Sequence, residues 1–408
     1  MSDLLFRRML LRRKLFKRVV LIVITLLVSF YGTRLLFGDL KSPKLMQLTD
    51  LQRCPACYGI SICPELYSNQ ITVESLNPWP SLFNIKNVYY GYTKTNKLVV
   101  LKKLAHSWEL TQFDTNLCKN WGLDNDCKPK DLLAISNVDD HIIRSVQYNL
   151  SYPELKPRKG LVMCPYAYSI YDLIQPVLKK SNAKSDMINV WTMLNINPEP
   201  LILQVLQKSK GWPVPAWGGV CGRLEVVSND GVPLSAIMDI TYHRKLLIAH
   251  RILNAAMDFT FKHDRFRFYL MDWSLDNIVV NEKDEVSFID LEDIIVLDKF
   301  ISPGIDLPHW YQRYSKEDIG PGFVFSIEKN CRYHLSDHNL WAACFILAGN
   351  ESPLLYPIPA EIDKARPHFQ KLLHDCLSSD DRFQIVAKLQ TLINNMLLDE
   401  KVLSSRPL

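Results

Sequence analysis

The sequence predicts an α+β fold of two lobes, a smaller lobe rich in strands and a larger helical lobe, behind one N-terminal membrane anchor. Three observations predict it. A basic tail runs into an apolar segment, short apolar runs between turn residues occur within residues 54–230, and helical spacing of apolar residues is prominent in residues 231–408. Of the 408 residues, 48% are hydrophobic and 22% are charged, which is typical of globular proteins and excludes a disordered or fibrous chain.

The first 37 residues predict the anchor. Residues 1–18 carry a charge of +6, whereas the remainder of the chain sums to −1. Residues 19–33 are uncharged and mostly apolar, and a helix over 19–37 would span about 28 Å, close to the roughly 27 Å core of an ER-type bilayer if Arg34 snorkels. The alternative is a cleaved signal peptide, but no alanine precedes Ala56 to form an A-x-A cleavage site. We therefore expect a transmembrane signal-anchor at 19–37.

The positive charge of the tail also predicts the topology. By the positive-inside rule, residues 1–18 stay cytosolic, so the stem (38–53) and the body lie in the lumen of the ER or Golgi. Cleavage that would release the body to the extracellular space stays open. The sequon at Asn149 agrees with a luminal body and is a candidate glycosylation site. Because the net positive charge is confined to the tail, we expect no nucleic acid partner.

All ten cysteines lie beyond the anchor, between Cys54 and Cys376. An even number in an oxidising compartment predicts disulfides. The alternative is half of a zinc site in the CPACYGISIC segment, but no second CxxC supplies the remaining ligands. Cys118 and Cys127 are the best local pair, because the eight residues between them can close a short polar loop.

The body alternates between strand and helix patterns. Apolar runs bounded by turn residues predict strands at 87–92, 97–104, 200–206 and 223–227. Apolar residues then recur at helical spacing from Arg244 to His263, which predicts a long buried helix. Two short strands follow at 277–281 and 285–289, and helical patterns dominate 338–398.

The residues that carry chemistry follow this long helix. Asp272, Asn277 and Asp290 repeat acid, amide and acid at fixed spacing. Phosphoryl transfer from a nucleotide needs a carboxylate near the attacking hydroxyl and oxygen ligands for Mg²⁺. Each residue alone could equally cap a turn or end a strand, and Lys102 could be an ordinary strand lysine. Their joint order and spacing favour the phosphoryl-transfer reading.

The pattern resembles the protein kinase catalytic loop, in which Asp is followed five residues later by Asn, and two strands lead to a metal-binding Asp. Val99-Val100-Leu101-Lys102 resembles the VAIK strand. More widely, the chain resembles the divergent protein kinase domain family of the secretory pathway, in its deleted-in-autism branch. The segments that carry this resemblance are CPACYG, NVYY before VVLKKL, Asn197-Pro198-Glu199-Pro200, Cys221-Gly222-Arg223, LDN in the loop, and Asp337-His338-Asn339.

The resemblance implies a two-lobed kinase-like fold with ATP and Mg²⁺ or Mn²⁺ as cofactors. Lys102 would bind the phosphates, Asp272 would act as catalytic base, and Asn277 and Asp290 would hold the metal. The acidic partner of Lys102 stays open between two residues, of which Glu109 is preferred over Asp186. Asp337 lies where kinases anchor the catalytic loop from below.

Departures from the kinase pattern keep a second function open. Leu270 and Met271 replace the His-Arg of the HRD motif, Glu292 replaces the Gly of DFG, and Gly91 alone stands where a glycine-rich loop is expected. One reading is a Golgi kinase acting on a secretory protein or glycan. The other is a catalytically silent pseudokinase that binds a partner, such as a receptor, as an extracellular signalling module.

Overall fold

The computed structural model describes residues 45–54, 57–73, 88–120, 122–124, 127, 131, 143, 146, 160–178, 184–301, 309–311, 319–320, 322–323, 326–349 and 353–404. Within these residues, no helix combines the length and the hydropathy needed to span a bilayer. The expected tail, the anchor at 19–37 and the sequon at Asn149 lie outside the described residues.

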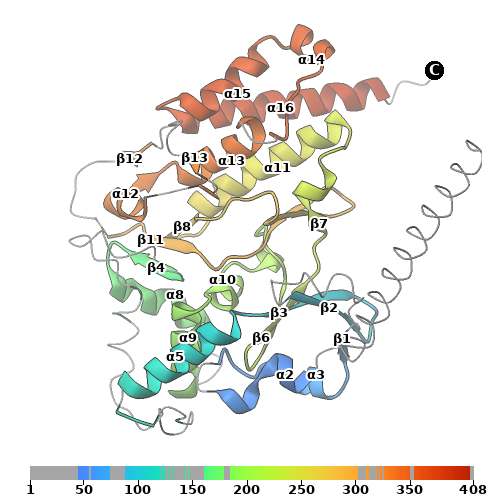
Figure 1. Cartoon of the computed structure of the whole chain (residues 1–408). Helices are drawn as coiled ribbons and strands as arrows, with labels where there is room; N and C mark the ends of the chain where they lie inside the picture. The colour runs from blue at the N-terminus through green and yellow to red at the C-terminus, as the bar shows by residue number, and fades with distance from the viewer. Residues whose placement is uncertain are drawn as a thin grey trace, which may run out of the picture.

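A five-stranded antiparallel sheet forms the lower part of the molecule in Figure 1, where four of its strands are labelled. Its spatial order is β1-β2-β3-β6-β5. The strands are β1 (Ile71–Val73), β2 (Val88–Thr93), β3 (Leu98–Lys103), β6 (Leu224–Ser228) and β5 (Trp217–Cys221). The strands expected at 87–92, 97–104 and 223–227 are thus present, with ends shifted by one residue.

Helices pack beside this sheet, and one of them corrects the sequence analysis. They are α2 (Leu45–Thr49), α3 (Cys63–Tyr67), α5 (Ser107–Asn120), α8 (Ile170–Leu178), α9 (Lys184–Asn195) and α10 (Glu199–Val205). The strand expected at 200–206 is wrong, because this segment is α10, which contacts α8, α9 and β5. Six of its seven residues are buried. A helix buried on all sides gives the same continuous apolar run as a buried strand, so periodicity could not separate them.

Helices make up the upper part of the molecule in Figure 1. The long helix α11 (Tyr242–Phe261) is the one expected from residue 244 onward. It packs against α13 (His338–Ala348) and α16 (Arg382–Ser404), and α15 (His368–Ser378) packs against these two helices. The N-cap Thr241 accepts the N–H of Arg244, which satisfies one free donor of the first turn. Among the described residues, the remaining helices are α12 (Ile327–Arg332), α14 (Ala360–Ala365) and the short 3₁₀ turns Leu51–Arg53, Ala167–Ser169, Lys208–Lys210 and Leu234–Ile237.

Two three-stranded sheets lie between these parts. One has the order β10-β9-β7, from Val286–Phe288, Ile278–Val280 and Val232–Pro233. The other has the order β4-β11-β8, from Leu161–Cys164, Ile294–Asp298 and Phe266–Leu270. Because β4 pairs in parallel with β11, the segment expected to form the smaller lobe also supplies a strand to the second half of the chain. Two short pairs join β12 (His309–Trp310) to β15 (Leu335–Ser336) and β13 (Ile319–Gly320) to β14 (Gly322–Phe323).

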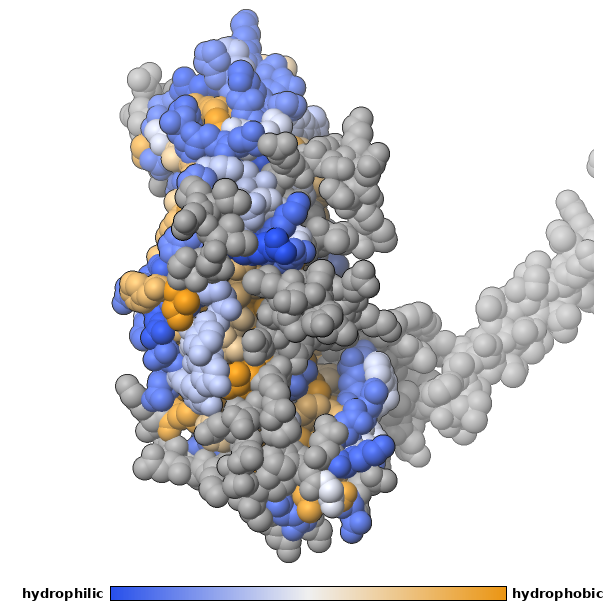
Figure 2. All heavy atoms as spheres, turned by 90° about the vertical axis from the view of Figure 1, so that its left-hand side faces the viewer, coloured by the Kyte–Doolittle hydropathy of each residue, from blue (hydrophilic) through white to orange (hydrophobic). Residues whose placement is uncertain are grey.

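Disulfides join all ten cysteines, as the sequence predicts. The bridges are Cys54–Cys57, Cys63–Cys221, Cys118–Cys127, Cys164–Cys331 and Cys344–Cys376. The third is the local pair expected from the sequence, whereas the second and fourth connect segments 158 and 167 residues apart. On the face seen in Figure 2, hydrophobic side chains of the described residues lie in separate patches among hydrophilic ones, as on most globular proteins.

Candidate functional site

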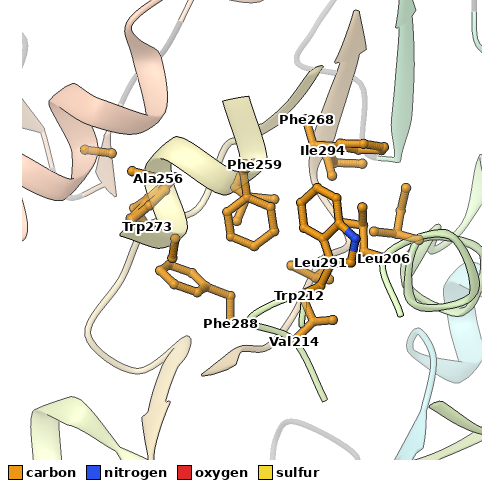
Figure 3. Close-up of a cluster of buried hydrophobic side chains, with 14 of the residues drawn as sticks. Leu206, Trp212, Val214, Ala256, Phe259, Phe268, Trp273, Phe288, Leu291 and Ile294 are labelled. Carbon is orange, nitrogen blue, oxygen red and sulfur yellow. The ribbon is translucent and has the colours of Figure 1, made fainter. Parts of the chain in front are cut away.

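A cluster of buried aromatic side chains fixes the two segments that carry the candidate acids (Figure 3). Trp273, which follows Asp272 directly, packs edge-on against Phe288 with ring centroids 4.7 Å apart. Phe288 in turn contacts Phe259 of α11 at 5.4 Å and lies two residues before Asp290. Because edge-to-face aromatic pairs favour one geometry, this cluster holds the loop after β8 against the strand that leads to Asp290.

Asp272 and Asn277 lie together in the loop between β8 and β9. The Nδ2 of Asn277 donates to Oδ2 of Asp272 at 2.8 Å. Asp272 is exposed, whereas Asn277 is buried. The backbone carbonyl of Asn277 accepts the N–H of Ile289 at 2.9 Å. That backbone bond brings Asn277 beside the residue that precedes Asp290. The spacing read from the sequence therefore corresponds to one compact group.

Lys102 of β3 forms a buried ion pair with Glu199, the first residue of α10. Its Nζ donates to Oε1 at 2.9 Å and to Oε2 at 2.8 Å, and Glu199 is fully buried. Asp290 is the second acid near this ammonium, with Oδ1 at 3.9 Å from Nζ. Burial acts to lower the pKa of Lys102, but the negative charges of Glu199 and Asp290 outweigh burial and raise its pKa, so Lys102 is cationic.

This pairing corrects the sequence analysis, which preferred Glu109 and kept Asp186 as an alternative. Glu109 lies in the first turn of α5, where its Oε2 accepts the N–H of His106 at 2.9 Å. Asp186 lies in the first turn of α9. Glu199 was missed because its segment was taken for the start of a strand. The signal present in the sequence was Pro-Glu-Pro, since proline and an acid in the first turn favour a helix start.

Hydrogen bonds link the start of α10 to the segment that resembles DFG. Asn197 accepts the N–H of Glu199 at 2.9 Å and donates to Glu292 at 3.1 Å. The N–H of Asp290 donates to Oε1 of Glu199 at 3.2 Å. Asp290 has a φ of +64°, an uncommon value for a residue with a Cβ that is often found at functional sites. The glutamate in place of glycine thus takes part in the contact with α10.

A second buried acid, Glu225 of β6, lies beside this pair. Glu225 is directly opposite Lys102 in the antiparallel register of β3 and β6, so both side chains lie on one face of the sheet. It is fully buried, and neither carboxyl oxygen has a hydrogen-bond partner within the described structure. Burial first, and then the charge of Glu199, raise the pKa of Glu225 well above its usual value, against the opposing effect of Lys102. Sequence patterns did not single out this residue.

Strand β8, which leads into the loop, is held in place by hydrogen bonds from α13. Asn339 donates to the carbonyl of Phe268 at 2.8 Å and accepts the N–H of Leu270 at 3.2 Å. The Nε2 of His338 lies 2.6 Å from the carbonyl oxygen of Leu270, so this nitrogen carries the proton. Burial lowers the pKa of His338 to about 4, which keeps it neutral. Asp337, expected to anchor the loop itself, forms a buried ion pair with Arg382.

The packing of two strands explains why residue 91 is a glycine, independently of phosphate binding. It lies within β2, and a Cβ at this position would lie 2.6 Å from the backbone oxygen of Thr72 on β1. The close approach of these two strands therefore requires glycine. The segment 74–87 that connects them lies outside the described residues.

The polar side chains of the site meet some of the requirements for binding a nucleotide together with a divalent cation. In the described part of the chain, no group of three His, Cys, Asp or Glu side chains that could hold a metal ion occurs. Mg²⁺ is usually held by one or two carboxylates together with substrate phosphates. Asp290 supplies a carboxylate, and Asn277 can supply its Oδ1, since its Nδ2 already donates to Asp272.

Comparison with known proteins shows which family this site resembles. Residues 190–379, which include Glu199, Asp272 and Asp290, match the family model described as the protein-kinase domain of FAM69. The chain is also 28% identical over 402 residues to Divergent protein kinase domain 2A of Homo sapiens, which covers 88% of this chain and 92% of that protein. The chain is similar to the divergent protein kinase family over most of its length.

Other members of this family match as well. Divergent protein kinase domain 2A of Xenopus tropicalis is 27% identical over 401 residues, or 90% of this chain and 92% of the relative. Divergent protein kinase domain 2B of Mus musculus is 22% identical over 218 residues, which is 50% of each chain. The resemblance to the divergent kinase family read from the sequence is therefore confirmed, and the mixed α+β structure is that of a kinase-like protein.

Proposed function

We propose that this divergent kinase is an ATP-dependent phosphotransferase of the secretory pathway that phosphorylates a hydroxyl group of a luminal or secreted protein or of a glycan. One observation carries the proposal. Lys102, buried with Glu199, has Asp290 within 3.9 Å, and the backbone of Asp290 is bonded to the same glutamate. A buried ion pair is a poor way to stabilise a sheet, because desolvation offsets the Coulomb attraction. Its retention favours a role for Lys102 toward an anionic ligand.

Each polar residue then has a role in phosphoryl transfer. The ammonium of Lys102 would bind phosphate oxygens while Glu199 holds the lysine in place. Asp290 and Oδ1 of Asn277 would hold Mg²⁺ or Mn²⁺, which when bound neutralises charge on the phosphates. Asp272 is exposed and is oriented by the amide of Asn277, so it can accept the proton of the acceptor hydroxyl.

The alternative is a pseudokinase that binds a partner, such as a receptor, and one observation favours it. Glu225 lies opposite Lys102, where an ionised carboxylate would repel the phosphates that an active kinase must bind. In this reading the kinase shape is retained as an interaction surface, and the ion pair at Lys102 only connects the sheet to α10.

The location in the secretory pathway is part of the proposal. Five disulfides support an oxidising compartment, since such bridges are rare in the cytosol. A signal-anchor at 19–37 would hold the body in the lumen of the Golgi or ER. Protease added to sealed microsomes should then remove only the tail, and digestion of the body would contradict this topology.

The enzymatic proposal is tested on the purified full-length protein with intact disulfides. We would measure the thermal shift caused by ATP with Mg²⁺ or Mn²⁺, and phosphate transfer to proteins and glycans of a secretory extract. Asp290→Asn should lose the nucleotide-dependent shift, because a neutral amide is a weak ligand for a hard cation. Asp272→Asn should keep the shift and lose transfer.

A matched control comes from the same loop. Asp276 accepts a hydrogen bond from Ser235 and lies four residues from Asp272, so Asp276→Asn changes the same charge nearby. It should retain both the shift and the transfer. A wild-type protein that shows neither the shift nor transfer, with either cation, would reject the kinase proposal and leave the pseudokinase reading.

A further inference from the structure

Glu225 occupies a place where a charged side chain is costly. It lies in the middle of β6, fully buried, and both of its carboxyl oxygens are without a hydrogen-bond partner in the described structure. A buried carboxylate without a partner is among the least favourable groups in a folded protein. Retention of such a group therefore needs a reason beyond stability.

The position relative to Lys102 supplies that reason. Lys102 and Glu225 face each other across β3 and β6, and directly opposed residues of antiparallel strands have Cβ atoms about 5 Å apart. The ammonium of Lys102 is already held by both oxygens of Glu199. A single cation is thus surrounded by two buried carboxyl groups, with the carboxylate of Asp290 at 3.9 Å as a third.

The charge balance at this place depends on one proton. With Glu199, Glu225 and Asp290 all ionised, one ammonium would face three negative charges. The other titratable groups that interact with this cluster do not correct the balance. Tyr58 is buried with a raised pKa, so it stays neutral, and the guanidinium of Arg223 is paired with Asp114. Burial favours the neutral, protonated form of Glu225, which lowers the number of negative charges around the ammonium from three to two.

We propose that Glu225 binds and releases one proton inside the site, and that the protonated form is the one in which Lys102 can hold a phosphate group of a nucleotide. When Glu225 is neutral, Lys102 faces only Glu199 and Asp290, and an anion meets one negative charge fewer at the ammonium. When Glu225 loses its proton, its carboxylate competes for the ammonium and repels phosphate. Nucleotide binding should then weaken as the pH rises. This inference rests on the proposed nucleotide-binding function.

The first measurement does not require a nucleotide. We would compare the thermal unfolding of the wild-type protein and of Glu225→Gln between pH 5 and pH 8. An acid whose pKa is raised by folding contributes stability below the pKa of the unfolded state. That contribution is lost as the pH rises from the pKa of the unfolded state to that of the folded state. As the pH increases, the unfolding temperature of Glu225→Gln should therefore rise relative to that of the wild type.

The second measurement uses ATP with Mn²⁺ as the probe over the same range. For the wild type, affinity should fall by about tenfold for each pH unit above the pKa of Glu225, as expected for one coupled proton. Glu225→Gln should bind with little change over this range. Ionisation of ATP itself affects both proteins equally. Glu361→Gln, an exposed substitution on α14, is the control and should follow the wild type in both measurements.

The outcomes separate this inference from the proposed function. A temperature difference that does not vary with pH, or the same pH profile of affinity in wild type and Glu225→Gln, would overturn the inference while leaving nucleotide binding established. Absence of ATP binding by both proteins at every pH would reject the proposed function together with the role of Glu225 in it, and the unfolding data would still show whether Glu225 titrates. Should Glu225→Gln not fold, Glu225→Met provides an uncharged substitute of similar volume.

Discussion

The ion pair between Lys102 and Glu199 gives a quantitative test of the site. Glu199→Gln keeps the shape of the side chain and removes its charge. The carboxylate accepts two hydrogen bonds from Lys102, at 2.8 and 2.9 Å, and a third from the N–H of Asp290. An amide retains one oxygen acceptor and turns an NH₂ group toward the ammonium. The variant therefore leaves a buried cation poorly compensated.

The expected cost follows from burial. The side chains of Lys102 and Glu199 are 11% and 1% exposed, and removal of one partner of a buried pair costs about 3–5 kcal/mol. Glu225 should reduce this cost, because it can lose its proton and replace the missing charge. We expect about 3–5 kcal/mol when Glu225→Gln is also present. In the wild-type background the cost should be smaller by about 0.5–3 kcal/mol, the usual coupling between residues in contact.

The assay is a double-mutant cycle by equilibrium denaturation at neutral pH without reductant. It compares the wild type, Glu199→Gln, Glu225→Gln and the double variant. Asp258→Asn is the control, since Asp258 pairs with Lys262 one turn away on the surface of α11 at 3.1 Å. An exposed pair of this kind contributes about 0–1 kcal/mol.

Two results would refute this reasoning. A cost below about 1 kcal/mol for Glu199→Gln in the Glu225→Gln background would mean that Lys102 does not depend on Glu199 for its charge balance, against the expected range for buried pairs. An equal cost in both backgrounds would mean that Glu225 does not interact with Lys102.

The other predictions concern His338 and the disulfides. Burial lowers the pKa of His338 to about 4 from about 6.5, so its neutral form contributes stability above pH 6.5 that is lost as the pH falls toward 4, by about 3 kcal/mol. His338→Gln, which can still donate to Leu270, should flatten this acid-side loss in denaturation curves, and an unchanged slope would contradict it. Cys118→Ser opens a bridge with a sequence separation of 9, and Cys331→Ser opens one with a separation of 167. Chain entropy predicts losses of about 2.5 and 5 kcal/mol, and the reverse order in non-reducing denaturation would rule out this entropic account.

The local parts of the site could be predicted from the sequence. Asp272 and Asn277 lie five residues apart in one loop, so their hydrogen bond depends on a short stretch of chain. The hairpin of β9 and β10 then leads through Phe288 to Asp290, and its turn at residues 282–284 can be predicted from the sequence. Cys118 and Cys127 pair for the same reason, since a short loop closes at a small entropic cost.

The partners of Lys102, in contrast, depend on contacts between distant parts of the chain. Glu199 is 97 residues away in the sequence, on a helix whose continuous apolar run was read as a strand. Glu225 faces Lys102 only because β6 pairs with β3 in a particular register, and a shift of one residue would turn its side chain to the other face. The long-range disulfides belong to about 945 conceivable pairings of ten cysteines. Spacing fixes contacts within a loop or hairpin, whereas contacts between distant segments depend on how the whole core packs.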